Sequence, residues 1–66
     1  MEIVVNGEPR EVAEHLTAAG LVDLLGLRDK RIAMEINLEI LPRSDYARHR
    51  LNPGDRIEVV HAIGGG

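Results

Sequence analysis

The sequence predicts a single small α+β domain with two layers, a mixed sheet and one main helix. Three observations support this. The chain has 66 residues, which is enough for one domain. Its hydrophobic period switches between two, typical of strands, and 3.6, typical of a helix. Strand-like segments stand at both ends of the chain, with the helical stretch between them. Because Tyr46 is the only aromatic residue, the core must be aliphatic.

A hairpin and a short helix are expected first. In "EIVVNGEPREV", Ile3 and Val5 lie on one face of a strand, and Asn-Gly is a strong signal for a two-residue turn into the strand that returns. A helix should follow, with Thr17 as its N-cap and Gly26 just beyond its last turn. Its apolar stripe has helical spacing and consists of Ala18, Leu21, Val22 and Leu25.

The second half of the chain predicts three more strands. "RIAMEIN" alternates as a middle strand, "EIL" is its short partner, and "RIEVVH" is the last strand. Between them Pro42 ends the pairing, Ser44 caps one turn of helix, and Tyr46 packs over the end of the core. Asp55 serves the turn before the last strand. The predicted core contains Ile3, Val5, Leu21, Leu25, Ile36, Ile57 and Val59.

The order of these elements predicts a topology. If the strands near 2–6 and 56–61 pair in the middle of the sheet, they run parallel, and the last strand points its free end out of the domain. This is the β-grasp, or ubiquitin-like, arrangement. We expect the domain to span residues 1–63 and a flexible glycine tail to occupy residues 64–66.

Composition excludes several classes of function. Eleven acidic and eight basic residues give a net charge of -3, without a basic run, so nucleic acid is not expected as a partner. No apolar run approaches the ~20 residues of a membrane span, and a soluble cytoplasmic protein is expected. The chain has no cysteine, hence no disulfide and no thiol nucleophile. His15, His49 and His61 do not have the spacing of metal ligands, so no metal site is expected.

The chain ends in three glycines, Gly64, Gly65 and Gly66. Ordering glycine costs more conformational entropy than ordering any other residue, so this run adds nothing to stability. Taken alone, it is more often a linker remnant or a frayed end than a reactive terminus. Ile63 precedes it and is either an ordinary strand end or an anchor in a partner's groove, and the anchor is favoured.

"PRSDYA" followed by "LNPGDRIEVVHAIGGG" resembles the ThiS family, the sulfur carrier proteins of thiamine biosynthesis, which are related to MoaD. "NGE" in the first turn and "AMEIN" in the middle strand follow the same family order. The likeness covers almost the whole chain. Gly20 departs from it, because a better helix former usually stands at that position.

The resemblance implies a carrier and not an enzyme. A ThiF-type adenylating enzyme would use ATP to activate the carboxylate of Gly66, and a sulfur donor such as a cysteine desulfurase persulfide would convert it to a thiocarboxylate. A thiazole synthase of the ThiG type would then receive the sulfur. Gly65 and Gly64 would let the tail pass through a narrow channel, and Ile63 would contact the partner. No tightly bound cofactor is implied.

Other classes stay open. A carrier of the MoaD type, or one for cysteine synthesis, would share the fold and the terminal chemistry, although the short length and the "VVHAIGGG" ending argue against MoaD. A ubiquitin-like modifier would join Gly66 to lysines of other proteins. A module that only binds a partner would tolerate loss of the tail.

Overall fold

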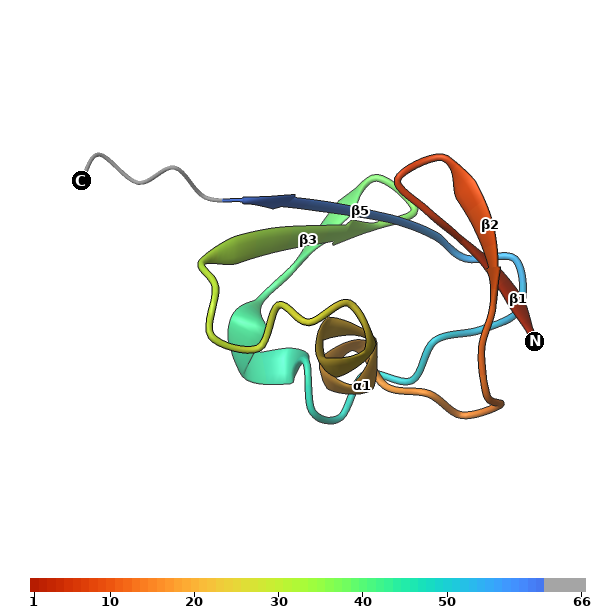
Figure 1. The fold of residues 1–66 in the computed structure, drawn as a ribbon, viewed down its shortest axis with the longest axis horizontal. Coiled ribbons are helices and arrows are strands. Elements are labelled where there is room, and N and C mark those ends of the chain that lie inside the picture. The colour runs from red at the N-terminus through yellow and green to blue at the C-terminus, as the bar shows by residue number, and fades with distance from the viewer. Residues whose placement is uncertain (62–66) are drawn as a thin grey trace.

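The computed structural model describes residues 1–61, which form a mixed sheet with one helix packed across one of its faces (Figure 1). The two-layer α+β prediction is therefore confirmed. Within this part of the chain the sheet has five strands in the order β2-β1-β5-β3-β4. In chain order the elements are β1 (Glu2–Val5), β2 (Glu8–Glu11), α1 (Ala18–Leu24), β3 (Ile32–Ile36), β4 (Glu39–Leu41), the 3-10 helix η1 (Arg43–Asp45) and β5 (Arg56–His61).

The first and last strands lie side by side in the centre of the sheet, as the sequence predicts. β1 pairs with β5 in parallel, with Val4 opposite Arg56 and Val5 opposite Ile57. β5 also pairs antiparallel with β3. The edge strand β2 contains Pro9, which lacks an N–H and is tolerated where no further strand must pair. This is the β-grasp topology.

One aliphatic core lies between the sheet and α1. Among residues 1–61 its thirteen buried apolar side chains are Ile3, Val5, Val12, Ala18, Leu21, Val22, Ile32, Met34, Ile36, Tyr46, Leu51, Ile57 and Val59. The packing role predicted for Tyr46 is confirmed. The prediction that Leu25 belongs to the buried core is wrong: its side chain is only partly buried against the cluster. The reason is that α1 ends at Leu24, so Leu25 is the C-cap and lies at the edge of the layer.

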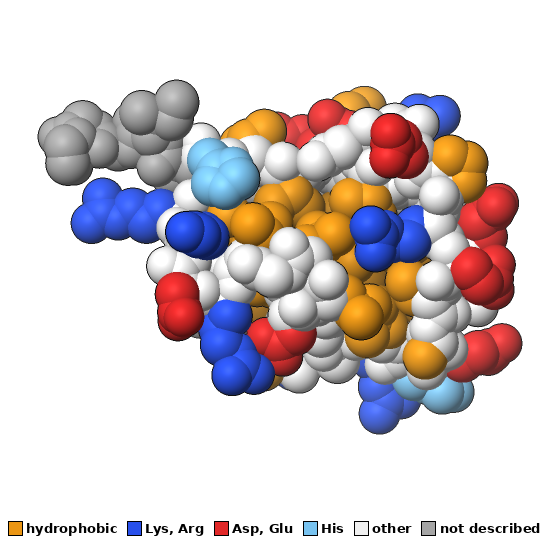
Figure 2. Space-filling view, in the orientation of Figure 1, with side chains coloured by type: hydrophobic (Ala, Val, Ile, Leu, Met, Phe, Trp, Pro, Cys, Tyr) orange, Lys and Arg blue, Asp and Glu red, His pale blue; other side chains and the backbone are white. Residues whose placement is uncertain are grey.

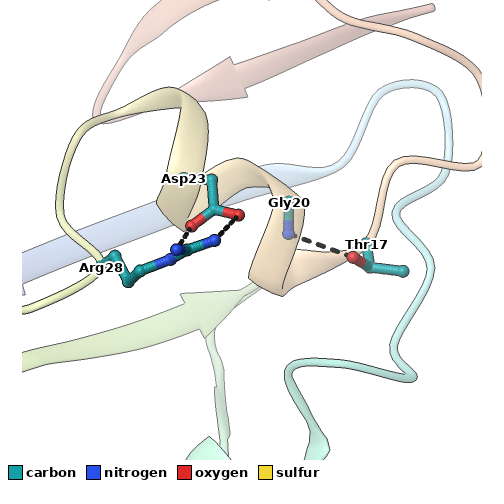
Figure 3. Close-up of polar contacts among 4 residues, drawn as sticks. All are labelled: Thr17, Gly20, Asp23 and Arg28. Carbon is teal, nitrogen blue, oxygen red and sulfur yellow. Dashed lines mark hydrogen bonds and ion pairs between the residues drawn. The ribbon is translucent and has the colours of Figure 1, made fainter.

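Both predicted ends of α1 are confirmed. The Gly20 N–H donates to the Thr17 hydroxyl over 3.1 Å, which satisfies one free donor of the first turn (Figure 3). At the other end Gly26 has a φ of +72°, and Leu27 donates its N–H to the Val22 carbonyl over 3.0 Å. Together with the bond from the Gly26 N–H to Asp23, this is a Schellman ending.

Gly20 has a packing reason for lacking a side chain. A Cβ at this position would lie 2.7 Å from Cδ1 of Leu16 and 3.4 Å from the Thr17 hydroxyl oxygen. The better helix former that usually stands here would therefore push Leu16, which is partly buried against the core. The glycine costs helix propensity but leaves room for this contact.

The prediction that Ser44 caps a helical turn is wrong. Ser44 lies inside η1, Pro42 occupies the N-cap position, and no side chain forms a cap hydrogen bond there. Proline fits because its fixed φ matches the extended conformation that precedes the turn. Pro42 also follows directly after β4, so its predicted role in ending that strand is confirmed.

Candidate functional site

The sequence places the candidate reactive group at the end of the chain, beyond β5. Ile63, Gly64, Gly65 and Gly66 lie outside the described residues, which end at His61. The part of the predicted site that the structure describes is therefore the strand that carries them and the groups that hold this strand. β5 runs from the centre of the domain toward the end of the chain (Figure 1).

Asn6 holds β5 from the side of β1. Its backbone N–H donates to the Ile57 carbonyl over 2.8 Å. Its side-chain oxygen accepts a hydrogen bond from the Val59 N–H over 2.8 Å, and its side-chain nitrogen donates to the Val59 carbonyl over 3.2 Å. The side-chain amide of Asn6 thus makes the hydrogen bonds that the backbone of a further β1 residue would make. It extends the hydrogen bonding between β1 and β5 as far as Val59.

Asn37 holds the start of β5 from the side of β3. Its side-chain oxygen accepts from the Arg56 N–H over 3.0 Å, and its side-chain nitrogen donates to the Asp55 carboxylate over 3.1 Å. Asp55 is buried, and its other oxygen accepts from the Asn52 N–H over 2.8 Å. The predicted role of Asp55 in the turn before the last strand is confirmed.

Sequence reasoning missed the two asparagine side chains. Each asparagine is the first residue of a two-residue hairpin turn and has a positive φ, 50° at Asn6 and 52° at Asn37. Asparagine is favoured in such turns for its backbone alone, so the pattern points to the turn and not to the side chain's partner. Val59 is 53 positions from Asn6, and nothing local connects the two.

The last two residues of β5 pair with only one of the described strands. Val60 pairs with Ala33 and His61 pairs with Ile32, both on β3, while the register with β1 covers only Arg56 and Ile57. Both Val60 and His61 are exposed. The strand therefore leaves the body of the domain with β3 as its one paired neighbour among the described strands.

Three ion pairs join charged groups among residues 1–61. Arg28 and Asp23 make a two-point ion pair at 2.9 and 3.0 Å on the surface (Figure 3). The hydrogen bond from Arg28 holds the pKa of the Asp23 carboxyl below its usual range. The pair borders an open hollow of about 300 Å³ between α1 and η1, with Arg43 and Ser44 on the other side.

The face of the molecule seen in Figure 2 is mixed. Figure 2 shows acidic and basic side chains interspersed, with apolar side chains exposed between them. Within residues 1–61 no group of three or more His, Asp or Glu side chains could hold a metal ion. In the same segment no helix is long and apolar enough to cross a bilayer.

Comparison with known proteins places this architecture in a family. Residues 3–66 match the ThiS family. The chain belongs to the ThiS family. The ThiS protein of Geobacter metallireducens, described as a thiamine biosynthesis protein, has the same fold in its crystal structure. Its TM-score is 0.86 at 32% identity, with all of both chains covered.

Two curated relatives of this ThiS-family chain differ in length. The sulfur carrier protein ThiS of Escherichia coli is 33% identical over 66 residues, which is 100% of both chains. A thiazole synthase of Paramagnetospirillum magneticum is 44% identical over the same 66 residues, but the chain spans only 20% of it. The chain therefore covers about a fifth of the length of that relative, whose polypeptide combines a ThiS-like segment with a much longer remainder.

Proposed function

We propose that this protein is a sulfur carrier of thiamine biosynthesis and that the carboxylate of Gly66 carries the sulfur. The observation that supports this most is the family match, which extends over residues 3–66 and so includes the terminal glycines. The full-length relative in Escherichia coli is named a sulfur carrier protein. The fold adds a physical reason, because side chains of Asn6 and Asn37 hold β5, the last described strand, within the sheet.

The proposed chemistry needs a free main-chain carboxylate. A terminal carboxyl has a pKa of about 3.5 and is ionised at neutral pH, so its oxygen can attack the α-phosphate of magnesium-ATP. Pyrophosphate leaves, and the acyl-adenylate makes the carboxyl carbon of Gly66 an electrophile. The outer sulfur of a persulfide then attacks this carbon and displaces AMP. A thiol cleaves the S–S bond of the resulting acyl disulfide and leaves the thiocarboxylate on the carrier.

In this proposal the partner enzymes supply the catalysis. An adenylating enzyme of the ThiF type would position the carboxylate and the ATP, and a cysteine desulfurase persulfide would supply the sulfur. Gly65 and Gly64 would let the tail enter a narrow channel, because a residue without Cβ is narrow. The missing Cβ of Gly66 would leave the attacked carboxyl carbon open. Ile63 would be the apolar anchor just outside that channel.

The acceptor of the sulfur in this proposal is a thiazole synthase. The relative from Paramagnetospirillum magneticum, in which a ThiS-like segment belongs to a longer chain named thiazole synthase, favours this over another sulfur pathway. A carrier whose acceptor is a thiazole synthase is expected to dock on that enzyme and to place Gly66 in its active site.

Intact-mass spectrometry tests the proposal. The full chain is incubated with a ThiF-type enzyme, magnesium-ATP and a persulfide source. We expect a product heavier by the difference between one sulfur and one oxygen atom, with the gain on Gly66 after fragmentation. The reaction without ATP is the control and should leave the mass unchanged. A mass gain on another residue would contradict the proposal. So would the absence of any mass gain on this chain when the enzyme used does thiolate its own carrier.

A further inference from the structure

The hollow between α1 and η1 takes no part in the chemistry proposed for Gly66. It is open, measures about 300 Å³, and is lined by residues of both elements and of the segments that follow them. The Ala19 N–H on α1 donates to the carbonyl of Tyr46, the C-cap of η1, over 3.0 Å. A backbone hydrogen bond thus joins the two walls, and the hollow is built into the fold.

The floor of the hollow is apolar. Among the residues that line it, Val22 and Tyr46 are each only 8% exposed and belong to the core. Ala19 and Ala47 line it beside them. These side chains offer a small apolar surface at the bottom of the hollow, against which the organic part of a ligand can pack.

Apart from Asp23, every polar side chain that lines the hollow can donate a hydrogen bond. Arg43 and Ser44 stand on η1, and neither side chain makes a hydrogen bond among residues 1–61. Arg28 donates to Asp23 through Nε and Nη2, which leaves Nη1 to donate elsewhere (Figure 3). The rim is therefore rich in donors that lack an acceptor in this part of the chain.

The Tyr46 hydroxyl is a further donor of this kind. It forms no hydrogen bond within residues 1–61. It is not sealed in the core either, because in this segment no buried side-chain oxygen or nitrogen lacks a partner. A side chain that is more than nine-tenths buried thus brings its hydroxyl to the surface, and the hollow is the opening that this side chain lines.

The lining of the hollow has a net positive charge. Asp23 and Arg28 neutralise each other as an ion pair, and the charge of Arg43 is left over. Asp45, the acidic residue of η1, is not part of the lining and is paired with Arg48. An anion that enters the hollow therefore meets a positive charge and several donors at once.

We propose that this hollow binds a small phosphomonoester, with the phosphate at the rim and the organic part over the apolar floor. The planar guanidinium of Arg43 is suited to two phosphate oxygens, and Arg28, Ser44 and Tyr46 border the same hollow with further donors. A phosphomonoester has three terminal oxygens and a charge of about −2 at pH 7, so it uses more of these donors than a carboxylate can. The site is separate from the terminal carboxylate, and its occupation does not depend on the proposed carrier function.

An NMR titration of the full chain with phenyl phosphate tests the site. At neutral pH and constant ionic strength, we expect saturable shifts of the backbone signals of Ser44, Tyr46 and Ala47, and none in β2, which does not line the hollow. Benzoate carries the same ring on a carboxylate and should bind about tenfold more weakly. The absence of saturable shifts, or equal affinity for phenyl phosphate and benzoate, would overturn the proposal.

Three substitutions separate specific binding from general attraction to positive charge. Arg43→Gln should weaken phenyl phosphate binding about tenfold. Tyr46→Phe keeps the ring in the core and removes only the hydroxyl, and should weaken binding several-fold. Arg10→Gln removes an exposed arginine on β2 and should leave the affinity unchanged.

Unchanged affinity in either hollow variant, or an equal loss in Arg10→Gln and Arg43→Gln, would contradict the proposed site. The thermal midpoint of each variant is measured alongside, and we expect all three to stay close to wild type. Since the titration needs neither ATP nor a partner enzyme, its failure is separate from failure to form the thiocarboxylate.

Discussion

The two ends of β5 are held in different ways. Over its first four residues, Asn6 from one side and Asn37 from the other bond to the strand through both backbone and side chain. At its far end, Val60 and His61 pair with β3 alone among the described strands, and both are exposed. The same strand is thus fixed in the middle of the sheet and only half covered where the chain leaves it.

This difference suits the proposed function, in which the reactive group is the carboxylate at the end of the chain. A carrier must present a short tail in a defined direction, so the strand before the tail has to be rigid. The tail must also fit into another protein, so the residues next to it must be accessible. Holding β5 firmly at its start meets the first requirement, and leaving its last residues with one neighbour meets the second.

The largest contrast should come from shortening one apolar side chain at each end of β5. Ile57 is fully buried, so Ile57→Ala should lower the free energy of unfolding by about 2–5 kcal/mol. Val60→Ala should change it by less than about 0.5 kcal/mol, because this exposed side chain packs little in the free protein. Urea denaturation of both variants measures the difference. Similar losses would show that the two ends are equally packed.

Asn6 tests the hydrogen bonds at the start of β5. Asn6→Ala removes two side-chain bonds to Val59 and puts alanine at a φ of 50°, so it should cost about 2–3 kcal/mol. Asn6→Gly removes the same bonds, but glycine adopts the positive φ without strain, so this variant should cost about 1–2 kcal/mol. Comparing the free energies of unfolding of the two variants separates the contribution of the side-chain hydrogen bonds from the backbone strain of the turn. If Asn6→Gly is as stable as wild type, the amide does not hold the strand.

The residue that follows each asparagine allows a test in which the expected change in stability is smaller and is a gain. Gly7 and Leu38 occupy equivalent positions in the two hairpin turns, with φ of 82° and 72°. A leucine in this region is strained, and Leu38 is 88% exposed, so little packing offsets the cost. Leu38→Gly should therefore stabilise the protein by about 0.5–1 kcal/mol.

The reciprocal change controls for this turn effect. Nothing lies within 4 Å of where a Cβ on Gly7 would be, so Gly7→Ala tests backbone strain without a clash. It should destabilise the protein by a comparable amount, seen as a lower midpoint in urea. A neutral result for both substitutions would mean that the two turns tolerate either residue and that the strain at Leu38 is absent.

The smallest effect should come from the ion pair between Asp23 on α1 and Arg28 in the loop that follows, far in sequence from β5. The Arg28 hydrogen bond lowers the pKa of Asp23, so the pair stabilises the folded state at neutral pH, and this contribution is lost as the pH falls through that lowered pKa. Arg28→Gln should return the pKa of Asp23 toward its usual range in an NMR titration. Arg31→Gln is the control and should leave that pKa unchanged. An unshifted Asp23 in the Arg28 variant would assign its low pKa to another group.

Much of this fold could be predicted because its signals are local. The Asn-Gly turn, the cap at Thr17, the glycine at the end of α1 and the alternation in β3 are each encoded within a few residues. The second turn was harder to read, because Leu38 is not a turn residue and takes a positive φ all the same. Leu25 was misjudged because periodicity gives the face of a helix but not the residue at which the helix ends.

The supports of the candidate site could not be predicted in the same way. The bonds of Asn6 to Val59 and of Asn37 to Asp55 depend on which strands become neighbours, and this is decided by the whole sheet. The terminal glycines themselves were identified by resemblance, since a glycine run has no distinctive chemistry of its own.

The most direct test of the central claim is the rate of thiocarboxylate formation when Gly66 is deleted. The new terminal carboxylate on Gly65 has the same intrinsic chemistry but ends about 3.5 Å short for an extended chain. Because misplacement by 1 Å can cost about a hundredfold, we expect the rate to fall at least that far while the thermal midpoint stays the same. A deletion variant that is thiolated as fast as the wild type would contradict the claim that Gly66 is the positioned, sulfur-carrying group.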